Sequence, residues 1–340
     1  MKRNNIAFIG AGFQATTNIF PAVIEAGINI TALATKNSDS AQAALTRLGS
    51  NGKAYGDYKL MLQQETVDSV VIVAQPKDQY EIALSCLELG KNVFVEKPLG
   101  WNAAQATLLN KAAIANNAKV MVGFMKRFAP SYLKVKELID TKELGEVRSF
   151  YLNFCVDGTP FCSDEEAFVK LAAIHVLDLA IYLFGDIDDV EVMNNSIGAS
   201  VNLVVAVKAE SGVVGSFNLS SMSAWSRESE NLTVTFDDGF VQVEEINKVI
   251  IHRSNKQTGK SFASLTESDE IHTASLTPMS GSVRDLYLRG FVGELAHFKN
   301  LQTNANTSET NGAENILTMA MCDLITVSYT HLTLPTIYSV

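Results

Sequence analysis

Two residues of this 340-residue sequence, Lys97 and His175, have the reactivity and the setting that acid–base chemistry needs. Lys97 follows the apolar run 92–95 and Glu96, and it precedes Pro98. Proline cannot donate a ladder hydrogen bond and pushes the residue before it toward an extended backbone. We therefore expect Lys97 at the carboxyl end of a buried strand, on a fixed backbone, at the edge where open α/β sheets bind ligands.

Lysine and histidine side chains can each take the proton of an alcohol while a hydride passes from the carbinol carbon to a nicotinamide. Burial and a nearby positive charge lower the pKa of a lysine and so prepare it for this role. His175 shares a helix face with Leu171 and Asp178, and the Asp178 carboxylate could fix the tautomer of its ring. Each residue has an ordinary alternative, because most lysines are solvated and many histidines on apolar helix faces are core residues.

A glycine turn near the start of the chain is the expected place for a nicotinamide cofactor. An apolar strand at residues 6–9 runs into the turn at residues 10–15, which opens a helix and then a second strand at residues 28–34. The turn has the G-x-G-x-x-A form of the dinucleotide fingerprint: Gly10 permits the tight turn, and Gly12 lets a pyrophosphate approach the helix N-terminus. The residues expected to bind the cofactor are Gly10, Ala11, Gly12, Phe13, Gln14, Thr35, Lys36, Ala74, Gln75, Pro76, Glu96 and Lys97.

The end of the second strand favours NADP over NAD as this cofactor. An acidic residue there would bind the 2′-hydroxyl of the NAD ribose. The sequence instead places Thr35, Lys36 and Ser38 there and reaches no carboxylate before Asp39. Thr35 and Ser38 can donate hydrogen bonds, and Lys36 can neutralise a 2′-phosphate. Alternatively, Lys36 is a solvated cation and Ser38 only caps the following helix.

Short apolar strands and helices alternate up to residue 123. Repeated βα units of this length predict a parallel, doubly wound sheet, and hence an α/β Rossmann domain over residues 1–124. Further strands are expected at residues 69–74, 92–95 and 119–123, and further helices at residues 39–48, 57–64, 77–89 and 102–116.

From residue 125 the strands become longer and alternate polar with apolar residues, which predicts an α+β domain with an open, largely antiparallel mixed sheet over residues 125–327. One sheet face should be covered by helices, and the other is a candidate surface for a homodimer or homotetramer. Residues 254–282 are expected to form a long loop, and residues 328–340 a non-native tail. The expected strands are 146–156, 188–197, 203–210, 213–221, 232–236, 240–245 and 248–253, and the expected helices are 131–139, 165–184, 287–301 and 313–327.

Composition narrows the classes of partner. The net charge of −10 argues against nucleic acid and against anionic membranes. The four cysteines are scattered, so we expect reduced thiols and a cytoplasmic location. The sequence has no zinc-ligand cluster, Ser-His-Asp triad motif or P-loop, and we expect no metal site.

The sequence resembles the glucose–fructose oxidoreductase/inositol dehydrogenase (Gfo/Idh/MocA) family over about residues 6–327. The resemblance rests on the first glycine turn, on residues 67–72, on residues 90–99 with Glu96-Lys97-Pro98, and on residues 174–179. It implies NAD(P)-dependent oxidation or reduction of sugars, cyclitols or related polyols, and assembly into dimers or tetramers through the C-terminal sheet. It also implies that Lys97 contacts substrate and nicotinamide and that His175 is catalytic. Arg127 and Asp178 are further candidates for substrate contact.

Three departures from the family pattern bear on the mechanism. Leu171 stands where the family has a catalytic aspartate, four residues before the histidine, and the usual glycines upstream are absent. Tyr80 occupies a place where a histidine is common. Either Lys97 and His175 suffice for catalysis, or another carboxylate replaces the missing aspartate, or the protein does not turn over a substrate. The candidates for that acid are Asp157, Asp164, Glu165 and Glu166.

The expected function is therefore an NADP-preferring oxidoreductase that acts on a sugar or polyol hydroxyl or carbonyl. Two alternatives stay open on the same fold. The first is a non-enzymatic regulatory protein that senses a nucleotide or a sugar, which the loss of the aspartate at Leu171 motivates. The second is a glycosidase that uses bound NAD transiently.

Overall fold

The computed structural model describes residues 5–254, 268–275, 279, 284–301 and 310–327, and these fall into two compact units. The first unit comprises Met1–Glu137, Ile246–Lys248 and Thr273–Met319. The second comprises Leu138–Glu245, Val249–His272 and Ala320–Val340. The tail expected at residues 328–340 lies outside the described residues.

The first unit contains a six-stranded sheet in the order β3-β2-β1-β4-β5-β6. All its neighbouring strands are parallel, so the sequence-based prediction of a doubly wound Rossmann sheet is confirmed. Ile9 pairs with Ala34 on one side and with Ile72 on the other, so the carboxyl ends of the three central strands lie side by side. The strands are β1 (Ile6–Ile9), β2 (Ile30–Ala34), β3 (Lys53–Tyr55), β4 (Ser69–Ile72), β5 (Asn92–Val95) and β6 (Val120–Val122).

Three helices of this unit begin at a side-chain cap. The side chains of Asn37, Asp57 and Asn102 accept hydrogen bonds from backbone N–H groups in the first turns of α2, α3 and α5. The helical elements are η1 (Ala15–Ile19), α1 (Phe20–Glu25), α2 (Ser38–Arg47), α3 (Tyr58–Gln64), α4 (Pro76–Glu88), α5 (Ala103–Ala115), η2 (Met125–Phe128), α9 (Arg284–Leu288) and α10 (Phe291–Leu301). Two more helices, α6 (Pro130–Thr141) and α11 (Gly312–Val327), begin in the first unit and end in the second.

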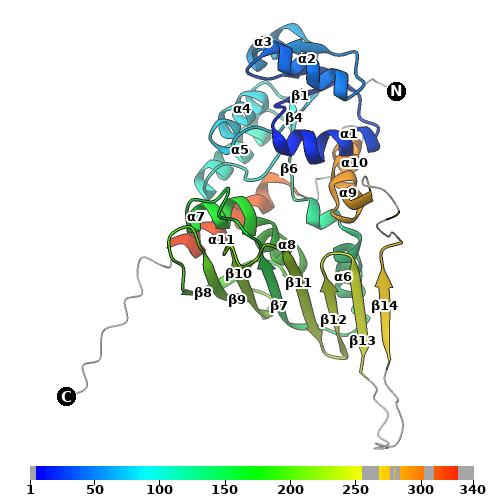
Figure 1. Cartoon of the computed structure of the whole chain (residues 1–340), viewed down its shortest axis with the longest axis vertical. Coiled ribbons are helices and arrows are strands. Elements are labelled where there is room, and N and C mark those ends of the chain that lie inside the picture. The colour runs from blue at the N-terminus through cyan, green and yellow to red at the C-terminus, as the bar shows by residue number, and fades with distance from the viewer. Residues whose placement is uncertain (1–4, 255–267, 276–278, 280–283, 302–309, 328–340) are drawn as a thin grey trace, which may run out of the picture. The chain divides into compact units, whose positions relative to one another are not determined.

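Helix α10 packs into the core of the first unit, although it comes late in the chain. Phe298 of α10 meets Phe94 of β5 edge-on, with ring centroids 5.7 Å apart, and Leu295 is fully buried in the same cluster. Figure 1 shows α10 beside α1. The compact units therefore interleave along the sequence, whereas the expected division places residues 125–327 in one C-terminal domain.

The second unit contains an eight-stranded sheet in the order β14-β13-β12-β11-β7-β10-β9-β8 (Figure 1). The central pair β7–β10 is parallel, and β7–β11, β11–β12, β9–β10 and β8–β9 are antiparallel, which confirms the expected mixed, largely antiparallel sheet. The strands are β7 (Val147–Cys155), β8 (Ile187–Asn194), β9 (Asn202–Ala209), β10 (Val214–Ser220), β11 (Ser229–Phe236), β12 (Gly239–Glu244), β13 (Lys248–Arg253) and β14 (Asp269–Thr273).

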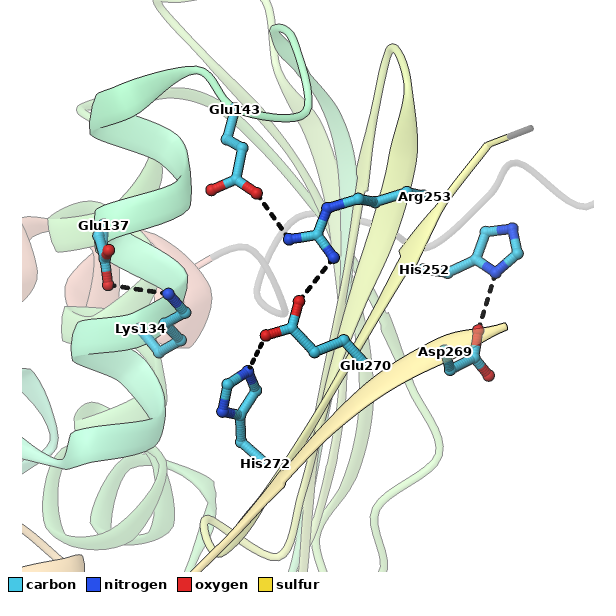
Figure 2. Close-up of polar contacts among 8 residues, drawn as sticks. All are labelled: Lys134, Glu137, Glu143, His252, Arg253, Asp269, Glu270 and His272. Carbon is cyan, nitrogen blue, oxygen red and sulfur yellow. Dashed lines mark hydrogen bonds and ion pairs between the residues drawn. The ribbon is translucent and has the colours of Figure 1, made fainter. Parts of the chain in front are cut away.

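The edge strand β14 corrects the prediction of a continuous loop over residues 254–282. All five residues of β14 are exposed, so the strand has no apolar alternation that a sequence pattern could reveal. Ion pairs connect it to the rest of the unit (Figure 2): Arg253 Nη1 lies 2.7 Å from Glu270 Oε2, and Arg253 Nη2 lies 2.6 Å from Glu143 Oε1. His252 Nδ1 lies 2.8 Å from Asp269 Oδ1.

The helix expected at residues 165–184 contains a wider turn. It consists of α7 (Glu165–Phe168), the π-helical turn η3 (Val169–Ala173) and α8 (Ile174–Phe184). The run is long and apolar enough to cross a membrane, but 83% of its most apolar window is buried inside the protein. Phe184 stacks on Phe150 of β7 with ring centroids 4.3 Å apart, so this is the core helix of the second unit.

Candidate functional site

The glycine turn after β1 has the backbone that a dinucleotide site needs. Gly10 has a φ of +106°, and a Cβ added there would lie 2.0 Å from the carbonyl oxygen of Val73, so only glycine fits. Gly12 differs, because an added Cβ would meet no atom of the described chain within 4 Å. Gly12 therefore leaves room for a ligand at the start of the helix, where Thr16 N already bonds Gly12 O at 3.0 Å. The cradle fits a pyrophosphate.

The turn after β2 holds Lys36 in an ion pair that the sequence did not reveal. Lys36 Nζ lies 2.7 Å from Asp78 Oδ2, in the first turn of α4. The hydroxyl of Thr35 donates a hydrogen bond of 2.5 Å to the carbonyl of Asn37. Two of the three groups expected to meet an NADP phosphate, Thr35 and Lys36, therefore already have partners within the chain.

The turn after β4 is braced against the end of β5. Gln75 is the N-terminal cap residue of α4, and Pro76 is the first helical residue, a position that suits proline. One turn later, the buried Gln79 donates from Nε2 to the carbonyl oxygens of Glu96 and Pro98, the latter at 3.0 Å. Gln79 is a positioning residue that the sequence analysis missed, because a glutamine inside a helix gives no local signal of such a contact.

Glu96 connects the glycine turn to the backbone of Lys97. Its Oε1 accepts a hydrogen bond of 3.2 Å from Gln14 Nε2, and its Oε2 accepts one of 3.2 Å from the backbone N–H of Lys97. Gln14 in turn accepts from Asn18 Nδ2 at 2.8 Å. Glu96 is 5% exposed, and burial raises the pKa of its carboxyl group. Two expected cofactor residues, Gln14 and Glu96, therefore form one bonded unit.

Lys97 is the half-buried member of an otherwise buried segment, because Glu96 and residues 98–100 are all buried. The peptide bond between Lys97 and Pro98 is cis. The structure thus places Lys97 at the carboxyl end of β5, as its position in the sequence predicts. Its backbone position is set by the bond from its own N–H to Glu96 and by the brace from Gln79 to the flanking carbonyls.

Glu294 is an unexpected carboxyl group in the same unit. It belongs to the first turn of α10, it is 0% exposed, and both of its carboxylate oxygens lack a hydrogen-bond partner in the described structure. Burial, reinforced by the charge of Glu96, raises the pKa of Glu294 well above its ordinary value. Gln14 and the Lys97 amide donate hydrogen bonds to Glu96, whereas the Glu294 oxygens have no such donor in the described structure, so the pKa of Glu294 is the more strongly raised of the two.

In the second unit, the open face of the core helix carries His175. Leu171, His175 and Tyr182 are half-buried, whereas their neighbours on η3 and α8 are almost all buried. Leu171 and His175 therefore do share a face, as their spacing predicts. Asp178 is 1% exposed and belongs to the buried side of α8. His175 is not sealed in the core, although its Nδ1 atom is inaccessible to solvent.

The four carboxylates considered as substitutes for the missing aspartate each make bonds within the second unit. Asp157 accepts from the Thr159 hydroxyl at 2.6 Å, and Asp164 caps α7 by accepting from the backbone N–H of Ala167 at 2.8 Å. Glu165 accepts from Asn194 Nδ2 at 2.8 Å. Glu166 pairs at 2.8 Å with the buried Lys170, which also lies 2.9 Å from Asp323 of α11. These bonds give all four acids structural roles.

Arg127 is also bound within its own unit. It is 2% exposed and forms an ion pair with Glu314 in the first turn of α11. This contact joins η2 to α11, so it accounts for the arginine without a ligand. The substrate contacts of Arg127 and of Asp178 stay predictions, as does the pairing of Lys97 with His175, which belong to different units.

Two family models match the chain. Residues 4–124 match the model described as an oxidoreductase family with an NAD-binding Rossmann fold, and residues 132–242 match the GFO/IDH/MocA C-terminal domain. The inositol 2-dehydrogenase/D-chiro-inositol 3-dehydrogenase of Lactiplantibacillus plantarum is 27% identical over 183 residues, which are 53% of this chain and 52% of that protein. The trans-1,2-dihydrobenzene-1,2-diol dehydrogenase of Xenopus laevis is 30% identical over 51% of each chain. The matched region thus spans about half the length of these relatives.

Solved structures share the whole architecture. A dehydrogenase from Chromobacterium violaceum superposes with a TM-score of 0.85 at 21% identity and covers 96% of this chain and 94% of its own. A levoglucosan dehydrogenase in complex with NADH and levoglucosan superposes with a TM-score of 0.81 at 16% identity and covers 96% and 97%. Together with the two matched models, the glycine turn and the Glu96-Lys97-Pro98 segment establish that this chain belongs to the Gfo/Idh/MocA family of NAD-binding oxidoreductases.

Proposed function

We propose that this protein is an NAD(P)-dependent dehydrogenase or reductase that transfers a hydride between the nicotinamide and a hydroxyl or carbonyl group of a sugar, cyclitol or related polyol. The observation that carries the proposal is the Glu96 carboxylate, which bonds both Gln14 of the glycine turn and the backbone N–H of Lys97. One buried group thus fixes the candidate proton acceptor to the turn that would hold the dinucleotide.

Each part of the first unit has a role in this proposal. Gly10, Gly12 and the start of the helix that follows them would hold the pyrophosphate, and a bound nicotinamide would accept or donate the hydride. Lys97 would take the proton from the substrate hydroxyl during oxidation and return it to the carbonyl oxygen during reduction. His175, on the open face of the core helix, would be the second acid–base group and would orient the hydroxyl.

We further propose NADP as the preferred cofactor, a cytoplasmic location and a homodimer or homotetramer assembled through the C-terminal sheet. The cofactor preference is supported by the absence of an acidic residue at the end of β2 and by Lys36 in the following turn. The cytoplasmic location is supported by four cysteines that are all buried free thiols. A 2:1 or 4:1 ratio of native to chain mass in light scattering would support the assembly, and a monomer at high concentration would contradict it.

A panel of sugars, cyclitols and polyols tests the reaction class. Each compound is mixed with enzyme and either NAD⁺ or NADP⁺, and reduced nicotinamide is followed by its absorbance. Cofactor binding is measured separately, by thermal stabilisation of the protein. The proposal expects binding of at least one cofactor together with turnover of at least one compound. Turnover of none, in either direction, would contradict the enzyme proposal.

A regulatory protein on the same fold is the second candidate, and Leu171 is the observation that favours it. This aliphatic residue occupies the half-buried position on the open helix face where the family has an aspartate. The same panel distinguishes the two candidates, because a sensor would bind the cofactor and be stabilised by a sugar without reducing or oxidising it. Release of a free sugar from glycosides in the presence of NAD⁺ would instead support the glycosidase alternative.

A further inference from the structure

We propose that Asp78 determines how strongly this protein discriminates between NADP and NAD, by holding Lys36 in an ion pair beside the cofactor's adenosine end. The inference rests on the proposed function, because it assumes that a dinucleotide binds at the glycine turn. It assigns a specificity role to a residue of α4 that neither the glycine fingerprint nor the turn after β2 contains.

The pair spans the strand that carries the glycine turn. Lys36 follows β2 and Asp78 follows β4, and these two strands flank β1 in the sheet. The carboxyl ends of all three strands are level, as Ile9 pairs with both Ala34 and Ile72. The 2.7 Å contact between Lys36 and Asp78 therefore connects the two turns on either side of Gly10. In dinucleotide-binding folds the adenosine ribose lies toward the end of the second strand, next to this pair.

The pair is accessible to a ligand. The side chain of Lys36 is 88% exposed and that of Asp78 is 32% exposed, so no part of the core has to open for a ligand to reach them. The hydrogen bond from Lys36 lowers the pKa of Asp78, and the charge of Lys77 lowers it further, so the carboxylate is ionised at neutral pH. Lys36, Lys77 and Asp78 together carry a net charge of +1.

These charges act in opposite directions on the two cofactors. A 2′-phosphate is attracted by Lys36 but must compete with Asp78 for its ammonium group, and it is repelled by the carboxylate. A 2′-hydroxyl carries no charge, so NAD does not incur this repulsion and can donate a hydrogen bond to the carboxylate. Asp78 thus supplies, from α4, the acidic group that the end of β2 lacks. Its effect is to limit the advantage that Lys36 gives to NADP.

Titration calorimetry of NADP⁺ and NAD⁺ binding tests the proposal without any need for turnover. The variants are Asp78→Asn, Lys36→Met and the double variant, with Glu88→Gln as a matched control. Glu88 is an exposed carboxylate ten residues further along α4, about 15 Å away along the helix axis. Thermal unfolding of each variant shows that the fold is intact.

Asp78→Asn should tighten NADP⁺ binding by about three- to tenfold at low salt, since a phosphate dianion loses a neighbouring negative charge and gains an unpaired lysine. The affinity for NAD⁺ should be unchanged or lower. The gain should shrink in 0.5 M salt because such exposed charges are screened. It should also disappear in the Lys36→Met background, and Glu88→Gln should not show it.

An unchanged ratio of the NADP⁺ and NAD⁺ dissociation constants in Asp78→Asn would overturn the inference while leaving the proposed function intact. An equal tightening of NADP⁺ binding in Glu88→Gln would also overturn the inference, because the effect would then come from net charge alone. If neither cofactor binds to the wild-type protein, the proposed function fails, and the inference fails with it.

Discussion

Replacement of Glu294 with glutamine should stabilise the first unit at neutral pH, and this gain should vanish as the pH falls. The Glu294 side chain is fully buried, and burial, reinforced by the charge of Glu96, raises its pKa well above 4.5. At a pH between the pKa of Glu294 in the unfolded chain, about 4.5, and its raised pKa in the folded chain, the unfolded chain carries an ionised Glu294 and the folded chain a neutral one. Folding then takes up a proton, so the stability of the wild-type protein decreases as the pH rises through this window.

The magnitude follows from this linkage. Within the window, each pH unit lowers the free energy of unfolding of the wild-type protein by about 1.4 kcal/mol. Glutamine keeps the size of the side chain but does not titrate. The difference in unfolding free energy between the variant and the wild type should therefore grow by up to about 1.4 kcal/mol per pH unit above the ordinary glutamate pKa. At lower pH both side chains are neutral, and the difference should be within about 1 kcal/mol.

Urea denaturation between pH 4.5 and pH 8 measures this difference. The chain has two tryptophans, Trp101 and Trp225, which belong to the first and the second unit, respectively. In a Trp225→Phe background the fluorescence of Trp101 reports on the first unit alone. The control Glu88→Gln removes an exposed carboxylate from the same unit and should keep the pH dependence of the wild type. If the Glu294→Gln difference is the same at pH 5 and pH 8, the buried carboxyl group is ionised in the folded protein and this reasoning is refuted.

Four further substitutions test other parts of the structure. Gly10→Ala should cost at least about 2 kcal/mol of stability, because φ is +106° and the new Cβ would clash with the carbonyl oxygen of Val73. Gly12→Ala should keep the melting temperature of the wild type but weaken dinucleotide binding in calorimetry, because the new Cβ meets no atom of the described chain. Lys170→Met should cost about 1.5–3 kcal/mol in urea denaturation of the second unit, since it removes charged hydrogen bonds to Glu166 and Asp323; a loss below 0.5 kcal/mol would contradict the role of this buried lysine. Arg253→Gln should lower overall stability by less than about 1 kcal/mol, because its ion pairs are exposed, yet should speed amide exchange in β14 and not in β7.

The fold of both units could be predicted from the sequence wherever apolar residues recur with a regular period. The central strands of the first unit are continuous apolar runs between helices, and the long strands of the second unit alternate. The prediction missed β3, which has only three residues, and β14, which has no buried face. It also assigned α10 to the C-terminal domain, because an amphipathic helix does not reveal against which core it packs.

Only those parts of the candidate site that consist of residues close together in sequence could be predicted. The glycine turn and the position of Lys97 follow from residues adjacent in sequence. The contacts that organise them do not: Gln14 and Glu96 are 82 residues apart, and Lys36 and Asp78 are 42 residues apart. Asp78 could not be predicted for this reason, since it lies on α4 and not at the end of β2, where the fingerprint places the acid that binds the ribose. Glu294 gave no signal either, because a single glutamate in the first turn of a helix is usually a solvated residue.

The most direct test of the central claim is the comparison of cofactor binding with turnover in Lys97→Met. Lys91→Met is its matched control, since Lys91 precedes β5 and thus lies at the amino end of the strand, whereas Lys97 follows its carboxyl end. With a substrate identified from the polyol panel, Lys97→Met should bind the cofactor within about threefold of the wild type, while its turnover falls by about 10²- to 10⁴-fold, the range for a lost general acid–base group. Lys91→Met should retain both properties. Unchanged turnover in Lys97→Met would contradict the assignment of Lys97 as the group that accepts and returns the proton.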